Sequence, residues 1–389
     1  MKITFISNFM NHHQLPLCRA LANDDDVDFT FIATRPIDAE RSQLGYIDMN
    51  GLEFVLCSYC SREAEKQAEK LCMESDVLIV GSAPERFFTR RLAAGKLTFR
   101  YNERIFKKGL YHAFSPRAYA NIRRLHGQYS HLLVYLLCSG AYVASDFNRM
   151  GAYRGKCLKW GYFPEVKRYD DIERLISAKK PHSLLYAGRF IDWKHPELAI
   201  AVAEQLQKRN IDFHLNMIGT GEMLPKISLV AEKRGLSEKV SVLGPMSPEN
   251  VRLYMEKSEI FLFTSDFNEG WGAVLNEAMN SACAVVASHA IGAVPYLIEN
   301  RKNGFIYKNG SLASLTKNVL LAMSDDDVRK AVQTAAYRTI CEKWNADIAA
   351  QRFLSVCRSL LDGEPIPDYT DGPCSAAMVL KNNWFGRSI

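Results

Sequence analysis

The sequence predicts an α/β protein made of two doubly wound, Rossmann-like domains, and three observations lead to this fold class. A chain of 389 residues is too long for one ordinary core, so two domains are the default expectation. Short apolar strands alternate with helical segments in each half, which indicates one buried parallel sheet per half. A polar, charged stretch at residues 165–181 joins the halves. We therefore expect a first domain at 1–165, a second at 166–344 and a C-terminal segment at 345–389.

The alternation of strands and helices can be followed along the chain. In the first half we expect strands at 2–7, 28–33, 53–57, 76–81, 97–101, 132–137 and 141–145, with a clear helix from Ser61 to Glu74. In the second half we expect strands at 183–187, 213–217, 240–243, 260–263 and 284–287. Its helices are expected at 196–209, 222–234, 248–257, 270–281, 312–323 and 325–343. A last helix at 345–362 is expected to cross back to the first domain. Two such domains would face each other across a cleft where the carboxyl ends of their strands meet.

The charge of the chain is unevenly distributed. The net charge is +6, but the stretch from Arg86 to Arg124 holds eleven Lys and Arg residues against one acid, Glu103. This stretch is either a solvated basic face or a surface for anionic lipid or phosphate-bearing substrates. Residues 86–91 and 106–111 mix cations with aromatic side chains, which favours peripheral attachment to an anionic membrane. Nucleic acid is disfavoured as a partner because no known reading motif accompanies the charge.

The cysteines and the N-terminus indicate a cytoplasmic protein. Ten cysteines are scattered along the chain, and Cys57-Ser-Tyr-Cys60 is the only close pair. A zinc site needs four ligands, so this pair alone predicts none, and the flanks of a thioredoxin-type redox pair are missing. Met1-Lys2 leads directly into an apolar strand rather than a signal peptide, and no apolar run reaches the ~18 residues of a spanning helix. We expect the chain to lie in the cytoplasm, with attachment to the inner face of the membrane left open.

Three segments at strand ends of the second half carry polar chemistry. In Tyr186-Ala-Gly-Arg189, followed by Lys194, two cations project from a turn. Arginine can make bidentate hydrogen bonds to a diphosphate and lysine adds a point charge, although both could be ordinary surface cations. The turn Met217-Ile-Gly-Thr-Gly-Glu222 is either a phosphate-approaching loop or only a tight connection. In Leu243-Gly-Pro-Met246 the loop could touch a nucleotide base, while Ser247 is a plausible helix N-cap.

The fourth segment, Glu269-Gly-Trp-Gly-Ala-Val-Leu-Asn-Glu277, is the most informative. It follows the apolar run 260–264, so it predicts a loop and the opening of a helix. The glycines let the backbone approach a ligand closely, and free amides at a helix start attract phosphate. Glu277, about two turns into the expected helix, could accept hydrogen bonds from ribose hydroxyls, or it could be an exposed helix residue. The combination suits a nucleotide diphosphate that carries a sugar.

Three features of the second half together resemble the group 1 glycosyltransferases, family 4 of the GT-B fold. They are Gly188-Arg189 with Lys194, the two glutamates, and Gly292-Ala-Val-Pro-Tyr-Leu-Ile-Glu299 before Asn303-Gly-Phe305. The resemblance covers residues 182–345 and is only general over the first half. It implies a retaining transfer of sugar from a nucleotide-diphosphate sugar, of UDP or GDP type, without a bound metal or other cofactor. It also implies that Arg189 and Lys194 neutralise the diphosphate, that Glu269 meets hydroxyls of the transferred sugar and that Glu277 holds the ribose. The donor-binding residues so implied are Gly188, Gly219, Met246, Gly270, Trp271, Gly272, Ala273, Val274 and Glu277.

The first half departs from the family's usual pattern. The loop after the first strand, residues 7–14, has no glycine, so side-chain donors from Asn11, His12 or His13 would have to replace backbone contacts. The histidine that family members often carry after the fifth strand is missing. Glu103 is a candidate catalytic residue there, with an ion-pair partner as the alternative, and His112 is a rival. The acceptor is expected to be a glycan or a lipid-linked molecule of capsule, exopolysaccharide or lipopolysaccharide synthesis.

Other functional classes remain open. A nucleotide-sugar epimerase of the same two-domain form would convert the donor without an acceptor. A non-catalytic nucleotide-sugar-binding protein would need only part of the cation and glutamate set. An NAD enzyme is disfavoured because no G-x-G-x-x-G follows the first strand.

Overall fold

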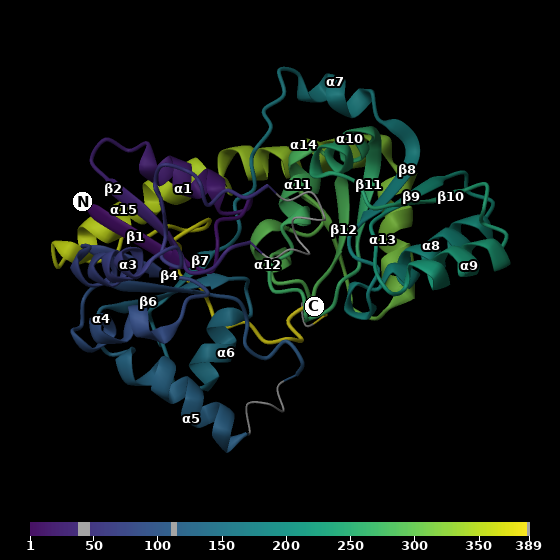
Figure 1. The fold of residues 1–389 in the computed structure, drawn as a ribbon. Helices are drawn as coiled ribbons and strands as arrows, with labels where there is room; N and C mark the ends of the chain where they lie inside the picture. Colours follow the sequence, from purple (N-terminus) through teal and green to yellow (C-terminus); the bar gives the residue numbers. More distant parts are fainter. Residues whose placement is uncertain (38–46, 110–114, 387–389) are drawn as a thin grey trace. The chain divides into compact units, whose positions relative to one another are not determined.

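The structure, a computed structural model, describes residues 1–37, 47–109 and 115–386 (Figure 1). Contacts divide it into two compact units. The first unit combines Met1–Glu165 with Trp344–Lys381, and the second combines Val166–Lys343 with the described residues after Lys381. Each unit has its own parallel sheet covered by helices, so the predicted α/β fold class is confirmed.

The sheet of the first unit has the order β3-β2-β1-β4-β5-β6-β7, and every pairing in it is parallel. Its strands are β1 (Lys2–Ser7), β2 (Asp28–Ala33), β3 (Val55–Cys57), β4 (Val77–Val80), β5 (Thr98–Asn102), β6 (Val134–Ser139) and β7 (Cys157–Trp160). Its helices are α1 (Leu15–Ala22), α3 (Arg62–Glu74), η1 (Glu85–Phe87), α4 (Thr89–Ala93), α5 (Pro116–Leu125), η3 (Gly127–Tyr129), α6 (Val143–Arg149) and α15 (Ala346–Leu361).

Two of these helices begin where the sequence indicates. The Ser61 side chain accepts a hydrogen bond from the amide of Ala64 and caps α3, and the Asn345 side chain accepts one from the amide of Ile348 and caps α15. Helix α15 packs against α1, so the C-terminal helix does return to the first unit (Figure 1).

The strand expected at 141–145 is wrong. Strand β6 ends at Ser139, Gly140 follows with φ at 116°, and the apolar residues after it form α6. The run is too short for its period to separate a buried strand from a buried helix. The seventh strand is instead β7, whose residues Cys157-Leu-Lys-Trp160 were not predicted as a strand.

The sheet of the second unit has the order β10-β9-β8-β11-β12-β13 and is also parallel throughout. Its strands are β8 (Lys180–Ala187), β9 (His214–Ile218), β10 (Val240–Gly244), β11 (Ser258–Phe263), β12 (Ala284–Ser288) and β13 (Phe305–Tyr307). Its helices are α7 (Ile172–Ser177), η4 (Asp192–Lys194), α8 (Pro196–Gln207), α9 (Leu224–Lys233), α10 (Pro248–Lys257), α11 (Val274–Asn280), α12 (Val294–Leu297), α13 (Leu312–Ser324) and α14 (Asp326–Glu342). Strand β13 was not predicted.

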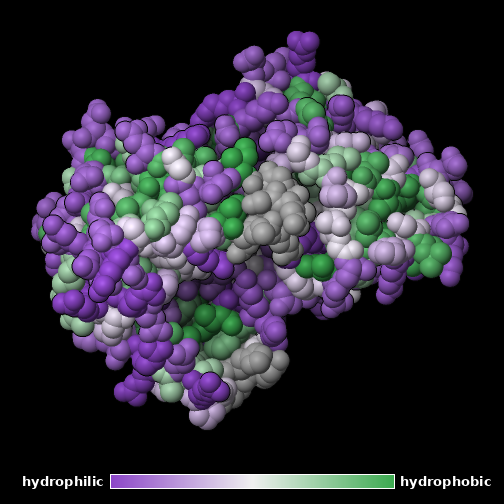
Figure 2. Space-filling view, in the orientation of Figure 1, coloured by the Kyte–Doolittle hydropathy of each residue, from purple (hydrophilic) through white to green (hydrophobic). Residues whose placement is uncertain are grey.

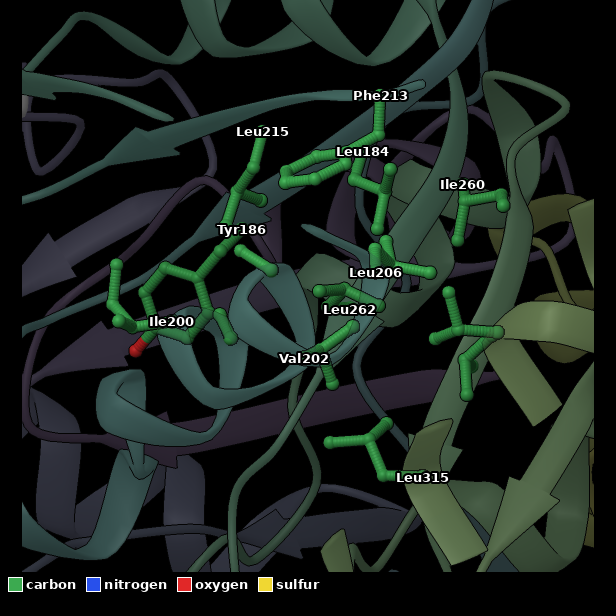
Figure 3. Close-up of a cluster of buried hydrophobic side chains, with 14 of the residues drawn as sticks. Leu184, Tyr186, Ile200, Val202, Leu206, Phe213, Leu215, Ile260, Leu262 and Leu315 are labelled. Atoms are coloured by element: carbon green, nitrogen blue, oxygen red, sulfur yellow. The ribbon is translucent and has the colours of Figure 1, made fainter. Parts of the chain in front are cut away.

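The core of the second unit lies between β8, β9 and β11 and the helices that cover them. Leu184, Leu215 and Leu262 from these strands meet Ile200 and Leu206 of α8 in one buried cluster (Figure 3). The ring of Tyr186 lies in the same cluster, with its hydroxyl at the edge. Strand β8 ends at Ala187, beside this buried cluster, and the loop that carries Arg189 and Lys194 begins there.

The surface in Figure 2 is mostly hydrophilic, with hydrophobic residues gathered in several separate groups. Among the described residues, no helix combines the length and the apolar character that crossing a membrane requires.

The end of the chain leaves the first unit. Ser145 Oγ donates to the carbonyl oxygen of Leu380, within the first unit. The residues from Asn382 group with the second unit, where the ring of His289 stacks at 5.7 Å on that of Phe385 and lies 6.3 Å from that of Trp384. The sequence predicts that all of 345–389 stays with the first domain, whereas the contacts divide this segment after Lys381.

Candidate active site

The loops after β8, β9 and β10 are joined through their main chains. The amide of Gly188 donates to the carbonyl oxygen of Ile218, and the amide of Gly219 donates to that of Gly244 at 2.9 Å. Gly219 has φ at +146°, and a Cβ there would lie 1.9 Å from the oxygen of Gly188. Glycine at 219 is therefore required by both its backbone conformation and its close neighbour. This contact fixes the position of the loop that carries Arg189.

The two predicted cations of the β8 loop come together around Trp193. The Arg189 Cζ lies 5.5 Å from the centroid of the Trp193 ring, and the Lys194 Nζ lies 4.8 Å from the same centroid. The hydroxyl of Tyr186 donates to the carbonyl oxygen of Arg189 at 3.1 Å, which anchors the loop to the core. The side chains therefore share one local environment, as the sequence predicts for a diphosphate-binding pair.

The structure also joins Lys194 to Glu269. The Lys194 ammonium donates to Glu269 Oε2, and Ser265 Oγ donates to the same oxygen at 3.0 Å. The Glu269 side chain is only 11% exposed, so the pair is largely shielded from water. Gly272 lies behind it with φ at +93°, and a Cβ there would meet Phe263 Cζ at 2.5 Å. The segments of Arg189, Lys194, Glu269 and Gly272 thus form one continuous group.

The helix expected from residue 270 begins at Val274, because the positive φ of Gly272 is not helical. Glu277 consequently lies in the first turn of α11 rather than about two turns in. Burial raises the pKa of its carboxyl, while the charge of Arg252 lowers it. Arg252 Nη1 donates to the carbonyl oxygen of Glu277 at 3.1 Å. Burial thus disfavours the charged form of this carboxyl.

The remaining predicted donor residues occupy different environments. Trp271 is fully buried and its Nε1 donates to Asn276 Oδ1 at 2.9 Å, so its indole belongs to the core. Ala273 and Val274 are partly exposed at the start of α11. Gly270 is buried, and a Cβ on Gly292 would lie 1.8 Å from its carbonyl oxygen. Met246 is partly exposed in the loop after β10.

The predicted cap beside that loop is present: Ser247 accepts a hydrogen bond from the amide of Asn250, and Pro248 begins α10.

Glu103 and His13, the candidates of the first half, are brought together in the first unit. Glu103 follows β5, and its carboxylate accepts from the Lys107 ammonium and from the Tyr162 hydroxyl, the latter at 2.9 Å. The ring centroid of His13 lies 5.8 Å from that of Tyr162 and 3.7 Å from that of His12. Glu103 is therefore an ion-pair partner inside a polar, aromatic cluster at the carboxyl end of the sheet.

The rival candidate His112 lies outside the described residues, as does Tyr111 of the expected aromatic stretch.

One feature of the second unit was not predicted. His195 has φ at 50° in the left-handed region, and its ring nitrogens face two carboxylates. Nδ1 lies 2.8 Å from Glu197 Oε1, and Nε2 lies 3.5 Å from Asp266 Oδ2. Hydrogen bonds to Asp266 and then Glu197 raise the pKa of His195 to about 10, against the effect of burial. Glu197 is two residues away in sequence, but Asp266 is brought close only by folding, so no local signal predicts it.

The cysteine pair and possible metal sites were also considered as functional centres. Cys57 and Cys60 are both free thiols. Within residues 1–37, 47–109 and 115–386, no group of three or more His, Cys, Asp or Glu side chains is arranged to hold a metal ion.

Comparisons with known proteins find similarity to glycosyltransferases. Residues 168–339 match the family described as glycosyl transferases group 1. The chain is 22% identical over 345 residues to the poly(ribitol-phosphate) alpha-N-acetylglucosaminyltransferase of Staphylococcus aureus, covering 86% of this chain and 66% of that protein. It is 29% identical over 159 residues to a Campylobacter jejuni diphospho-undecaprenol 4-alpha-N-acetylgalactosaminyltransferase, covering 41% of this chain and 42% of that protein. The chain thus spans less than two thirds of the length of these relatives.

The fold is shared with solved glycosyltransferase structures. HepE of Anabaena, in complex with UDP and glucose, superposes with a TM-score of 0.66 at 15% identity, covering 92% of this chain and 100% of that one. Most of the second unit, residues 168–339, thus matches the group 1 glycosyltransferases, and the two parallel sheets are of the GT-B type.

Proposed function

We propose that this protein transfers a sugar, with retention of anomeric configuration, from a nucleotide-diphosphate sugar to a glycan or lipid-linked acceptor in cell-surface polysaccharide synthesis. The observation that carries the proposal is the grouping of Arg189 and Lys194 around Trp193, with Lys194 paired to Glu269. Cations and a carboxylate arranged in this way suit a diphosphate joined to a polyhydroxylated sugar. The membership of family 4 among such transferases is part of the same proposal.

The chemistry follows from where charge develops. When the bond between the anomeric carbon and the diphosphate oxygen breaks, negative charge grows on the leaving diphosphate. Arg189 and Lys194 would stabilise that charge at fixed positions, which costs little reorganisation during the reaction. The new bond forms to an acceptor hydroxyl, whose proton passes to an oxygen of the departing phosphate. Glu269 would meet hydroxyls of the transferred sugar and Glu277 those of the ribose.

Two protein cations can supply the positive charge that many transferases obtain from a divalent ion. We accordingly propose that the transfer does not depend on a metal. Activity in the presence of excess EDTA should equal activity in its absence, and recovery of a lost rate by added Mg²⁺ or Mn²⁺ would contradict this part of the proposal.

The donor is proposed to be a UDP sugar. HepE was crystallised with UDP and glucose, and the Staphylococcus aureus and Campylobacter jejuni relatives are named for N-acetylhexosamine transfer. A GDP sugar is the alternative. The proposal of a lipid-linked acceptor is supported by the undecaprenol-linked substrate in the name of the Campylobacter jejuni relative.

Attachment to an anionic membrane surface is proposed for the first unit. Helix α5 has no buried residue and exposes Arg117 and Arg123. Positive charge on an exposed amphipathic helix favours anionic headgroups. Sedimentation with phosphatidylglycerol vesicles at low salt should carry the protein into the pellet, and replacing both arginines by glutamate should release it. Absence of pelleting at low salt would remove this proposal.

One assay tests the function. The protein is incubated with UDP-glucose, UDP-N-acetylglucosamine, UDP-N-acetylgalactosamine and GDP-mannose, and nucleotide release and sugar products are measured with and without a membrane lipid extract. Release of UDP from one donor, stimulated by the extract, is the expected result. Conversion of the donor to another nucleotide sugar without release would indicate an epimerase, and binding without either reaction would indicate a sensor.

A further inference from the structure

The loop that carries Lys194 is fastened to the loop that carries Glu269. Thr264 Oγ1 donates to the carbonyl oxygens of Lys194 and His195 at 2.7 and 3.0 Å. The amide of Asp266 donates to the carbonyl oxygen of Trp193 at 3.0 Å. The main chain of 193–195 is thus held from the end of β11, on both sides of Lys194.

The side chain of His195 adds a contact of a different kind. Its backbone lies in the left-handed region, where residues other than glycine are uncommon, although asparagine, aspartate and histidine occur there more often than the rest. His195 occupies the N-cap position of α8, yet its side chain makes no capping hydrogen bond. The ring instead lies between Glu197 of α8 and Asp266 of the β11–α11 loop, so its role is not that of a helix cap.

The charges around the ring explain its state. Both nitrogens face carboxylates, and a ring donates to two acceptors only when it carries both protons. Other titratable groups nearby are the phenols of Tyr186 and Tyr307, whose pKa values burial, together with the negative charge of Glu197, raises. Both phenols therefore stay neutral up to alkaline pH. The charged groups nearby are the ring, its two carboxylates and the ion pair of Lys194 with Glu269.

We propose that His195 is a positioning residue: held as an imidazolium between Glu197 and Asp266, it fixes the backbone from which the Lys194 ammonium reaches Glu269. This inference rests on the proposed function, since it takes Lys194 to act on the diphosphate. The left-handed turn at His195 sets the direction in which the preceding lysine leaves the chain. Without the ring, that turn keeps the contacts of the Thr264 hydroxyl and the Asp266 amide and the local hydrogen bonds of its own main chain, but it loses its ionic link to Glu197 and Asp266.

The first test separates positioning from stability. His195→Gly removes the ring and also relieves the left-handed backbone, so the fold should tolerate it. We expect kcat for UDP release from UDP-glucose or UDP-N-acetylglucosamine to fall about 10-fold, since a small misplacement of a charged group lowers the rate, while KM changes less than about threefold. His195→Asn, which tolerates the same backbone and keeps one donor, should recover part of the rate. His182→Gly is the matched control, because His182 also has a positive φ, at 55°.

The second test measures the protonation state of the His195 ring and does not depend on enzyme activity. In a carbon-13 spectrum of histidine-labelled protein, one of the nine histidines should remain doubly protonated at pH 8, and its signal should disappear in His195→Asn. Because the folded pKa is raised to about 10, the imidazolium contacts are present at neutral pH and are lost as the pH rises through that value. A His195 ring that titrates near its ordinary pKa would overturn the inference, whatever the variants do.

The outcomes separate this inference from the function on which it rests. If Lys194→Ala abolishes nucleotide release and His195→Gly leaves kcat within twofold, the positioning role is wrong and the function stands. If Lys194→Ala leaves the rate unchanged, Lys194 does not act on the diphosphate and the inference fails with it. If the unaltered protein releases no nucleotide from any of the donors, the proposed function itself is wrong. If Asp266→Asn lowers kcat as His195→Gly does, the double variant should be no slower than either single one.

Discussion

The carboxyl ends of the two parallel sheets are built in different ways. In the second unit, a Cβ on Gly219 or Gly292 would collide with the main chain of a neighbouring loop, and a Cβ on Gly272 would collide with the ring of Phe263. In the first unit, the loop after β1 has no glycine, and His13, Glu103 and Tyr162 provide the polar groups. Backbone recognition restricts the sequence to glycine, whereas side-chain recognition allows many solutions. The family match covers 168–339, within the second unit.

The largest expected effect tests the cation pair of the second unit. Lys194→Ala should lower kcat about 10²- to 10³-fold, as expected for loss of one group that stabilises developing charge, while the Kd for UDP rises less. Steady-state kinetics with calorimetric UDP binding would measure both. Lys208→Ala, at the exposed C-cap of α8 and paired with Glu204, is the control that should leave both values unchanged. Equal effects of the two substitutions would break the distinction between the site and the surface.

The second prediction concerns the glycine contacts themselves. Gly219→Ala should destabilise the second unit by about 2–4 kcal/mol, because the new Cβ must displace the main chain at Gly188 and the backbone conformation is unfavourable. Gly310→Ala shares a positive φ, at +74°, but its Cβ would meet nothing within 4 Å. Thermal unfolding of the two variants isolates the cost of the collision. Similar melting temperatures would mean that the loop adapts and that glycine is not required there.

The smallest expected effect lies in the first unit. Glu103→Gln keeps the shape and an acceptor for Tyr162 but weakens the contact with Lys107, so we expect about a 10-fold loss in transfer, the size of one charged hydrogen bond. UDP affinity should not change. Glu63→Gln, on an exposed position of α3, is the control. A weakened UDP affinity in Glu103→Gln would contradict the assignment of this cluster to the acceptor side.

Most of the fold can be predicted from the sequence because apolar segments of strand length alternate regularly with helical segments. The parallel strands of both sheets are short apolar runs, and Ser61, Ser247 and Asn345 cap helices through the side chains that commonly do so. The strand expected at 141–145 and the unpredicted β7 and β13 show the limit: runs of three to seven residues fit more than one period, and their pairing partners decide.

Some contacts of the candidate site could be predicted from the sequence and others could not. Arg189, Lys194, Glu269 and Gly272 could be grouped from the sequence because each follows a strand of one sheet, and such ends meet at one edge. The contact between His195 and Asp266 could not, because the two residues are 71 positions apart and neither belongs to a motif. The pairing of Glu103 with Tyr162 is hidden for the same reason: it joins the ends of β5 and β7, and β7 was not recognised.

The path of the chain has a practical consequence. It passes from one unit to the other after Glu165, again before Trp344, and a third time after Lys381. A protease that cuts between 165 and 166 would therefore release no independently folded half, because the C-terminal fragment would still carry α15, which packs on α1. Likewise, a fragment limited to 166–343 would lose the aromatic residues that cover His289. The two units have separate cores, but no single cleavage of the chain yields one fragment with all of the first unit and another with all of the second.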